Sequence, residues 1–297
     1  YICVSVEHSR WYYYDQEKHR WFLDDQGIRL KSKISTDIWE IFNEKGNYFA
    51  QCVTPEDDTF VARRDNCFAT CKNLKTTSVK SNILTECKEL FYDTDRIFLN
   101  KLDNNSKLLG FNNGVYDLDT FQFRNGKPED YISLSTGIDY SSISKWEDSS
   151  ELDEIKDFLE QVITNKNVRN YIINLMSTFI CGSTKNEKFH VWSGSGGNGK
   201  SKLIELLEHS LGDYCCKMSI QNLTSKRADA GAANPELART QGKRFLNLQE
   251  PDEKCKLNVG LMKEMTGGDK IIARALYKEP IEFKPQFKMV LTCNQKP

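Results

Sequence analysis

The chain has 297 residues, a length that favours about two domains. With 39% hydrophobic and 28% charged residues it has the composition of a soluble globular protein. No run of about 18 apolar residues occurs, so we expect no membrane contact. A net charge of −1 excludes a global electrostatic attraction to nucleic acid, although residues 186–297 carry 18 Lys and Arg against 13 Asp and Glu.

The chain begins with Tyr1 and shows no signal-like segment, so we expect it to be a piece of a longer polypeptide. Its ten cysteines are scattered along a long chain, which is typical of free thiols in a reducing, intracellular setting. Cys67 and Cys71 have no second pair or histidine at ligand spacing, so a structural zinc site is not predicted.

Residues 1 to about 75 contain a dense group of aromatic side chains. The segment from Trp11 to Phe22 predicts two strands joined by a polar turn at residues 15–18. Aromatic residues interleaved with Lys and Arg can stack on the bases of a single strand, but they form a core more often. We therefore favour a core for these side chains.

Residues 76–110 are expected to be mostly helical, with Leu84 and Leu90 on one apolar face. Asn113-Gly114 between two apolar runs predicts a hairpin turn, and a second turn is expected near residues 125–128. Residues 141–150 are mostly polar and are interpreted as a linker. The apolar periodicity of residues 151–181 indicates helices in front of the next domain.

The most specific motif is the run Gly-Ser-Gly-Gly-Asn-Gly-Lys-Ser at residues 194–201. It fits the phosphate-loop pattern G-x-x-x-x-G-K-[ST] without a mismatch. The apolar run Phe189-His190-Val191-Trp192 before it predicts a buried strand. Leu203, Leu207 and Leu211 after it predict an amphipathic helix that ends at Gly212.

This strand, loop and helix predict a site for a nucleoside triphosphate. Glycines let main-chain N–H groups approach a phosphate, and the helix N-terminus adds partial positive charge. Lys200 is expected to reach the β- and γ-phosphates, and Ser201 to ligate Mg²⁺. The residues predicted to bind nucleotide are Gly194, Ser195, Gly196, Gly197, Asn198, Gly199, Lys200 and Ser201. ATP and Mg²⁺ are therefore the expected cofactors.

Two further runs predict strands that end in polar residues. Residues 244–249 lead into Glu250, and residues 287–293 lead into Asn294. Ligands gather at the carboxyl ends of strands in open α/β sheets, so both side chains are catalytic candidates. We expect Glu250 to polarise the attacking water or to hold Mg²⁺, and Asn294 to contact the γ-phosphate or that water.

Between these strands, residues 266–284 predict a glycine turn followed by a hairpin with its tip near Lys278. A protruding lysine can contact the phosphates of a nucleic acid strand, but a solvated surface hairpin fits the composition equally well.

In this order, the motifs resemble those of superfamily 3 helicases, in particular the poxvirus-type primase-helicase ATPases of large DNA viruses. The resemblance covers about residues 80–297 and includes residues 113–118, 137–140, 194–201, 266–269 and 294–297. It implies an AAA+-type ATPase that forms a ring, usually a homo-hexamer, and translocates on single-stranded or forked DNA. It also implies that Lys278 contacts DNA, with Lys284 and Lys270 as the next candidates. Other replication proteins are further expected partners, and the host cytoplasm is the expected location.

The fold class we predict is α/β, an AAA+-type P-loop NTPase core with a helical collar and an α+β N-terminal domain. The expected boundaries are 1–145 for the N-terminal domain, 146–185 for the collar and linker, and 186–297 for an ATPase domain truncated at its C-terminus. The family's arginine finger would lie beyond Pro297. Many relatives carry two adjacent acids where this chain has Gln249-Glu250, so Glu250 would act alone or with Asp252 or Glu253.

Two alternatives remain at this stage. Asp117 and Asp119 supply two carboxylates that a metal-dependent primase or polymerase could use. The chain could also be a DNA-binding module in which nucleotide only locks an oligomer, without unwinding activity.

Overall fold

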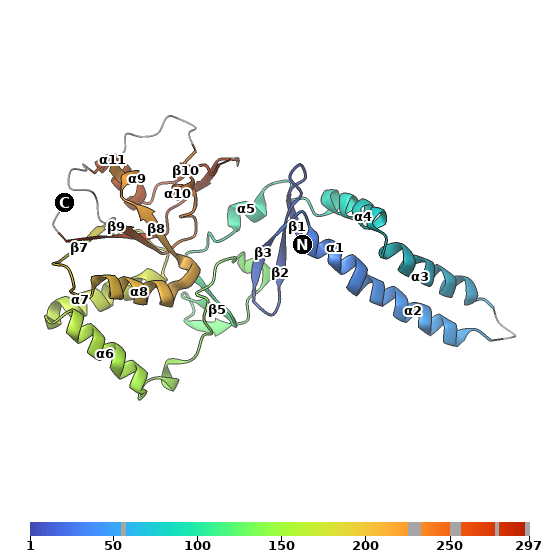
Figure 1. The fold of residues 1–297 in the computed structure, drawn as a ribbon, viewed down its shortest axis with the longest axis horizontal. Helices are drawn as coiled ribbons and strands as arrows, with labels where there is room; N and C mark the ends of the chain where they lie inside the picture. The colour runs from blue at the N-terminus through green and yellow to red at the C-terminus, as the bar shows by residue number, and fades with distance from the viewer. Residues whose placement is uncertain (55–57, 225–232, 250–256, 277–278, 295–297) are drawn as a thin grey trace. The chain divides into compact units, whose positions relative to one another are not determined.

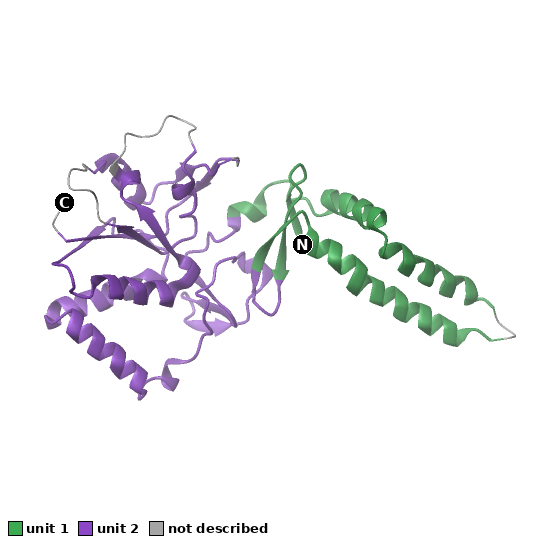
Figure 2. Cartoon of the chain, in the orientation of Figure 1, with its two compact units in different colours: residues 1–14, 21–100 green, residues 15–20, 101–297 purple. Residues whose placement is uncertain are grey.

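The computed structural model describes residues 1–54, 58–224, 233–249, 257–276 and 279–294 (Figure 1). Residues 1–14 and 21–100 form one compact unit, and residues 15–20 and 101–297 form the other (Figure 2). None of the described helices combines the length and the apolarity that a membrane crossing requires.

Unit 1 combines a three-stranded sheet with several helices. The strands β1 and β2 pair antiparallel, and β2 lies between β1 and β3. Trp11 and Trp21 are buried, which confirms the predicted strand pair and the core interpretation for these two side chains. The elements are β1 (Ile2–Ser5), β2 (Arg10–Asp15), β3 (Arg20–Asp25), α1 (Ile28–Lys33), a π-helical turn η1 (Ile34–Ile38), α2 (Trp39–Cys52), α3 (Val61–Leu74), α4 (Thr77–Leu90) and α5 (Ile97–Lys101).

The sequence did not predict α1 to α3. Helix α3 buries only Cys67, Cys71 and Leu74, so its apolar pattern is weak. Its stability comes from packing along α2, which is seen in Figure 1 as the neighbouring helix.

Unit 2 begins with a small antiparallel sheet, β4 (Leu108–Phe111), β5 (Gly114–Asp117) and β6 (Gln122–Arg124). The β4–β5 turn is at Asn112 and Asn113, because Phe111 pairs with Gly114. Our prediction of the turn at Asn113-Gly114 was therefore wrong by one residue. The two asparagine side chains of the turn donate to the carbonyls of Gly137 and Tyr140 at 2.6 and 3.0 Å, contacts that favour this position of the turn.

The larger sheet of unit 2 is parallel and follows the order β7–β12–β9–β8. Helix α8 packs Ile204, Leu207 and Leu211 against the sheet residues Phe245 and Val290, and its Leu203 packs against Leu159 and Ile172. The remaining elements are the short 3₁₀ turns η2 (Pro128–Asp130), η3 (Ile143–Lys145), η4 (Thr178–Ile180) and η5 (Gly212–Tyr214), and α6 (Ser150–Val162), α7 (Lys166–Ser177), β7 (Phe189–Ser193), α8 (Lys200–Leu211), β8 (Cys215–Ser219), α9 (Gln221–Thr224), α10 (Pro235–Ala238), β9 (Phe245–Gln249), α11 (Val259–Thr266), β10 (Ile271–Ala273), β11 (Ile281–Phe283) and β12 (Lys288–Cys293).

This architecture confirms a mixed α/β fold with a parallel sheet. The strands predicted before the loop, before Glu250 and before Asn294 are β7, β9 and β12, and the predicted hairpin is the antiparallel pair β10–β11. Strand β7 lies at the side of the sheet and is only partly buried, with Val191 42% exposed, so our prediction of a buried strand there was wrong. Helices α6 and α7 lie where the sequence indicated helices.

Polar side chains at the amino ends of three parallel strands form hydrogen bonds with main-chain groups of earlier segments of unit 2. Arg244, just before β9, donates to the carbonyls of Ser106, Asn105 and Leu108 at 2.6, 3.0 and 3.0 Å. Lys288, the first residue of β12, donates to the carbonyls of Thr178 and Cys181. Burial lowers the pKa of both cations, so these carbonyl contacts compensate for the lost hydration.

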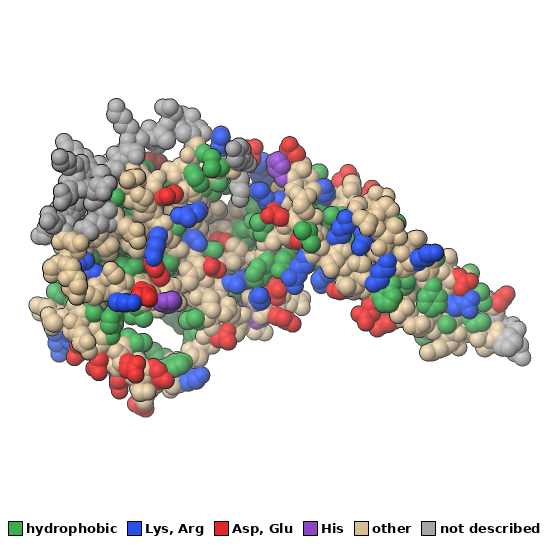
Figure 3. Space-filling view, in the orientation of Figure 1, with side chains coloured by type: hydrophobic (Ala, Val, Ile, Leu, Met, Phe, Trp, Pro, Cys, Tyr) green, Lys and Arg blue, Asp and Glu red, His purple; other side chains and the backbone are tan. Residues whose placement is uncertain are grey.

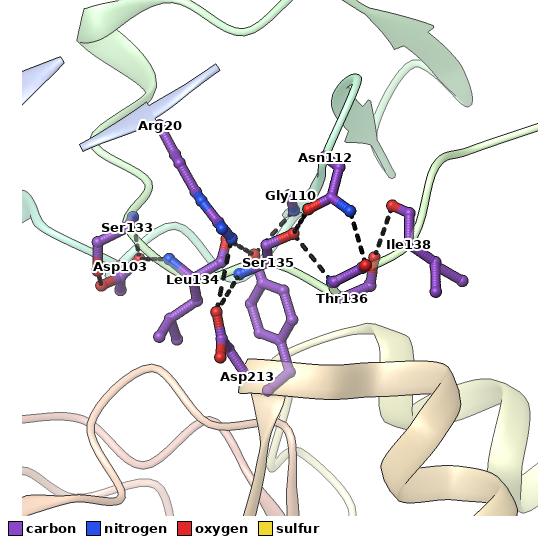
Figure 4. Close-up of polar contacts among 12 residues, drawn as sticks. Arg20, Asp103, Gly110, Asn112, Ser133, Leu134, Ser135, Thr136, Ile138 and Asp213 are labelled. Atoms are coloured by element: carbon purple, nitrogen blue, oxygen red, sulfur yellow. Dashed lines mark hydrogen bonds and ion pairs between the residues drawn. The ribbon is translucent and has the colours of Figure 1, made fainter. Parts of the chain in front are cut away.

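Tyr214, just before β8, makes the third such contact. Its hydroxyl accepts the N–H of Gly110 at 2.8 Å and donates to Leu134 at 3.2 Å. Around it, Asp213 accepts the N–H of Ser135 and lies 3.5 Å from the Arg20 guanidinium (Figure 4). Hydrogen bonds therefore hold the segment 101–138 in a fixed position against the parallel sheet.

Gly182 is required for this packing. A Cβ at this position would overlap Nη1 of Arg244, whose side chain is 1% exposed, and would lie 2.5 Å from Oε1 of Gln286. We predict that Gly182→Ala lowers the free energy of unfolding by about 3 kcal/mol or more, because it displaces a buried cation from its acceptors. Urea unfolding measures this change.

The matched control is Gly260→Ala on the exposed first turn of α11, where the nearest atom is 3.3 Å away. This variant should change stability by less than about 1 kcal/mol. Equal stability of the two variants would show that Arg244 accommodates the methyl group without loss of its contacts.

Candidate nucleotide-binding site

The 194–201 loop connects β7 to α8, as the motif predicts. Gly197 and Gly199 have φ angles of 76° and 82°, a backbone region that favours glycine. Gly199 also meets the end of α6, because a Cβ there would lie 2.5 Å from Val162. The loop is therefore held in shape from two sides, by β7 and by α6.

The N–H groups of residues 195–201 have no acceptor among the described residues. They form the start of α8 and the turn before it, where a helix presents its positive end. Loop residues Gly196 and Gly197 have open space where a Cβ would stand. Uncompensated donors around open space are the arrangement that binds a phosphate group.

The ammonium group of Lys200 lies against the loop. Its Nζ donates to the carbonyls of Gly194 and Ser195 and, at 3.0 Å, to Oδ1 of Asn198. Oδ1 of Asn294 lies 3.5 Å from the same Nζ. The strand pairing that brings these two side chains together is β7 with β12.

Asn294 therefore stands where the sequence placed it, at the carboxyl end of a buried strand next to β7. The N–H of Gly194 donates to the carbonyl of Cys293 at 3.3 Å, which ties the start of the loop to the end of β12. Glu250 lies outside the described residues, but β9, which ends at Gln249, is the next strand of the sheet. Ser201 is exposed on the first turn of α8, with its side chain available for a metal-bound phosphate.

Among the described residues no group of three or more His, Cys, Asp or Glu side chains is placed to hold a metal ion. A divalent ion at this loop would instead rest on the Ser201 hydroxyl, phosphate oxygens and water, which suits Mg²⁺. The residues present thus fit a magnesium nucleotide.

The predicted DNA contacts are spread over the β10–β11 hairpin. Lys278 lies outside the described residues. Lys270 pairs with Glu282 at 2.8 Å on the exposed face of the hairpin, and Lys284 is exposed just after β11. The structure brings neither Lys270 nor Lys284 to the nucleotide loop.

The carboxylates of the primase alternative have structural partners. Oδ1 of Asp117 accepts the N–H of Asp119 at 2.9 Å, and Asp119 lies 3.5 Å from Lys107. These contacts stabilise the β5–β6 turn and do not direct two carboxylates at one point.

Sequence reasoning did not find Val162 or Arg244. Val162 is the last residue of an amphipathic helix, and its contact with Gly199 depends on tertiary packing. The lone arginine before β9 carries no motif, and only its 1% exposure reveals its role.

Comparisons with known proteins give the family of the chain. A family described as "D5 N terminal like" matches residues 2–164, and a "Family of unknown function (DUF5906)" matches residues 192–297. The Acanthamoeba polyphaga mimivirus protein named "Putative helicase L207/L206" is 40% identical over 100% of this chain and 31% of its own length. The Frog virus 3 protein named "Putative helicase 022R" is 30% identical over 81% of this chain and 30% of its own length.

The chain belongs to the D5-type primase-helicase family of large DNA viruses. A third D5-type relative, "Putative primase C962R" of African swine fever virus, is 30% identical over 73% of this chain and 22% of its own length. The chain thus spans between about a fifth and a third of these relatives. Among solved structures, the C-terminal region of NrS-1 covers 49% of this chain and 34% of its own at 16% identity, with a TM-score of only 0.40.

His190, in the middle of β7, makes the strand before the loop sensitive to acid. Burial, followed by the charges of Lys188 and Lys288, lowers the pKa of its imidazole. The folded protein therefore favours the neutral imidazole. This preference contributes to the free energy of unfolding above the unfolded-state pKa of about 6.5, and the contribution is lost as the pH falls below that value.

We predict that His190→Gln loses less stability than the parent between neutral pH and about pH 5.5. Urea unfolding at both pH values measures the difference. The same loss in parent and variant would show that other groups control the acid sensitivity.

Proposed function

We propose that this chain carries the nucleotide site of an ATP-dependent DNA helicase or translocase that acts in viral DNA replication. The observation that carries the proposal is the loop at residues 194–201, with donors that lack acceptors and with Lys200 3.5 Å from Asn294 on the neighbouring strand. The choice of a helicase as the activity rests on the names of the relatives.

In this proposal the main-chain N–H groups of residues 195–201 bind the phosphates of ATP. Lys200 leaves the carbonyls of Gly194 and Ser195 and moves its charge to the β- and γ-phosphates. Electrostatic stabilisation of the phosphates carries most of the catalysis in such enzymes. Bound Mg²⁺, held through Ser201 and Glu250, would neutralise phosphate charge.

Asn294 and Glu250 are assigned to the attacking water. Asn294 has its amide at the mouth of the loop, where it can contact the γ-phosphate or the water. Glu250 follows β9, the strand beside β12, so its carboxylate is the candidate that orients the water and accepts its proton.

The strand order β7–β12–β9–β8 supports an AAA+-type core in residues 186–297, because the loop strand lies beside the Asn294 strand and one strand from Glu250. Helices α6 and α7 pack Leu159 and Ile172 on Leu203 of α8, which supports a collar in residues 146–185 that follows the nucleotide state. Residues 1–145 would form the N-terminal domain. We propose that ATP is hydrolysed between subunits of a homo-hexameric ring in the host cytoplasm, with DNA and other replication proteins as partners.

Lys200→Ala tests the proposal. It should reduce ATP turnover by the full-length protein at least about 100-fold, because it removes a positive charge from the phosphates. The control is Lys202→Ala on the same helix, whose exposed side chain pairs with Glu205, and it should turn over ATP at the parent rate. Phosphate release with and without single-stranded DNA is the measurement.

Near-parent turnover by the Lys200→Ala variant would contradict the site. If the parent protein bound ATP but did not turn it over even with DNA, the module that is only locked by nucleotide would replace the helicase.

A further inference from the structure

A second cleft, of about 670 Å³, lies in unit 2 away from the nucleotide loop. Its walls include residues 181–185 and Glu187, just before β7, and Pro285 and Gln286, just before β12. Because these strands are parallel, the cleft lies at their amino ends, and the 194–201 loop lies at the opposite edge of the sheet.

Three lysines from three separate segments line this cleft: Lys107, Lys185 and Lys284. Glu187 is the acidic residue among its lining side chains. Lys107 forms an ion pair with Asp119 at 3.5 Å. Lys185 and Lys284 form no ion pair within the described residues. The cleft therefore carries a net positive charge although the whole chain is at −1.

The rest of the wall is backbone and small polar side chains. Gly268 stands between Thr184 and Lys284, and a Cβ on it would lie 3.1 Å from the Thr184 hydroxyl and 3.8 Å from Nζ of Lys284. Buried Gln286 donates to the carbonyl of Asp103 but leaves its Oε1 without a donor. The Thr184 hydroxyl can donate to a phosphate oxygen, whereas Oε1 of Gln286 is buried and can only accept.

Among the described residues that line this cleft, none has an aromatic side chain. Proteins that bind single strands through the bases stack them on aromatic rings, so base stacking has no platform here. The volume and the spread of the lysines over three segments exceed what one phosphate requires, and they suit an extended polyanion.

The surface over α6 is less suited to this role. Acidic side chains gather over α6 in Figure 3, where the helix carries Glu151, Asp153, Glu154, Asp157 and Glu160. A polyanion is repelled from that surface and is attracted to a cleft that carries lysines.

We propose that this cleft binds the sugar-phosphate backbone of a single-stranded nucleic acid without reading its bases. The inference deepens the proposed function, on which it rests for its choice of DNA as the partner. It adds Lys107 and Lys185 to the candidate contacts and places them with Lys284 in one cleft.

The test is binding of labelled oligothymidylate to the full-length protein without nucleotide, measured by fluorescence anisotropy over a series of salt concentrations. The double variant Lys185→Ala/Lys284→Ala should bind several-fold more weakly. The slope of log K against log salt should fall by about 1.4, because each phosphate contact on a single strand contributes about 0.7. An abasic oligomer of the same length should show the same fall.

Two controls accompany this variant. Lys156→Ala/Lys166→Ala removes two exposed lysines on α6 and α7 and should leave the slope unchanged. Lys185→Arg/Lys284→Arg keeps both charges and should keep the parent slope. If the slope drops in the arginine variant as well, the lysines act on the fold rather than on phosphate, and the proposal fails.

Three other results would overturn the proposal. An unchanged slope in the alanine variant would remove these lysines from the interface. A fall seen with oligothymidylate but not with the abasic oligomer would show base recognition. Calorimetric binding of inorganic phosphate that depends on the same lysines, with oligonucleotide affinity unchanged, would assign the cleft to a small anion.

This outcome is separable from that of the nucleotide site. Lys200→Ala should retain nucleotide-free DNA binding, and Lys185→Ala/Lys284→Ala should retain ATP turnover in the absence of DNA. If one assignment fails, the other can therefore still be tested.

Discussion

The parallel pairing of β7 with β12 is the constraint on which the site depends. It sets the carboxyl ends of both strands at one edge, so the loop after β7 and Asn294 after β12 meet. The hydrogen bond from Gly194 to Cys293 and the 3.5 Å approach of Lys200 to Asn294 both follow from this register. A shift of this pairing by one residue would turn alternate side chains to the other face of the sheet and separate these groups.

The opposite edge of the sheet has a different chemistry. Tyr214 and Arg244 bind main-chain groups of residues 105–110 and so fix the small β4–β5–β6 sheet to the parallel one, whereas Lys288 binds the carbonyls of Thr178 and Cys181 in front of β7. Buried cations are costly, and here hydrogen bonds to main-chain oxygens compensate for the loss of water. The nucleotide loop and the basic cleft thus lie at opposite edges of one parallel sheet, and α6 contacts the loop at Gly199.

Much of the parallel sheet and its loop could be predicted from the sequence, because the signals are local. The glycine run, the apolar strands before Glu250 and Asn294, and the four-residue spacing of Leu203, Leu207 and Leu211 lie within short windows. The rest depends on contacts between distant residues. Arg244 has its acceptors 136 to 139 residues away, and the observed position of the β4–β5 turn is favoured by contacts of Asn112 and Asn113 with residues 137 and 140. Helix α3 has a weak apolar pattern and forms against α2, so its own sequence could not predict it.

The central claim is that the main chain of residues 195–201 binds the phosphates of ATP. A crystal or cryo-EM structure of the full-length protein with magnesium and a non-hydrolysable ATP analogue tests it most directly. Our account predicts phosphate oxygens at the N–H groups of the loop, and Nζ of Lys200 moved from the carbonyl of Gly194 to the phosphates. An analogue bound elsewhere, with Lys200 still on Gly194 and the loop unchanged, would contradict it.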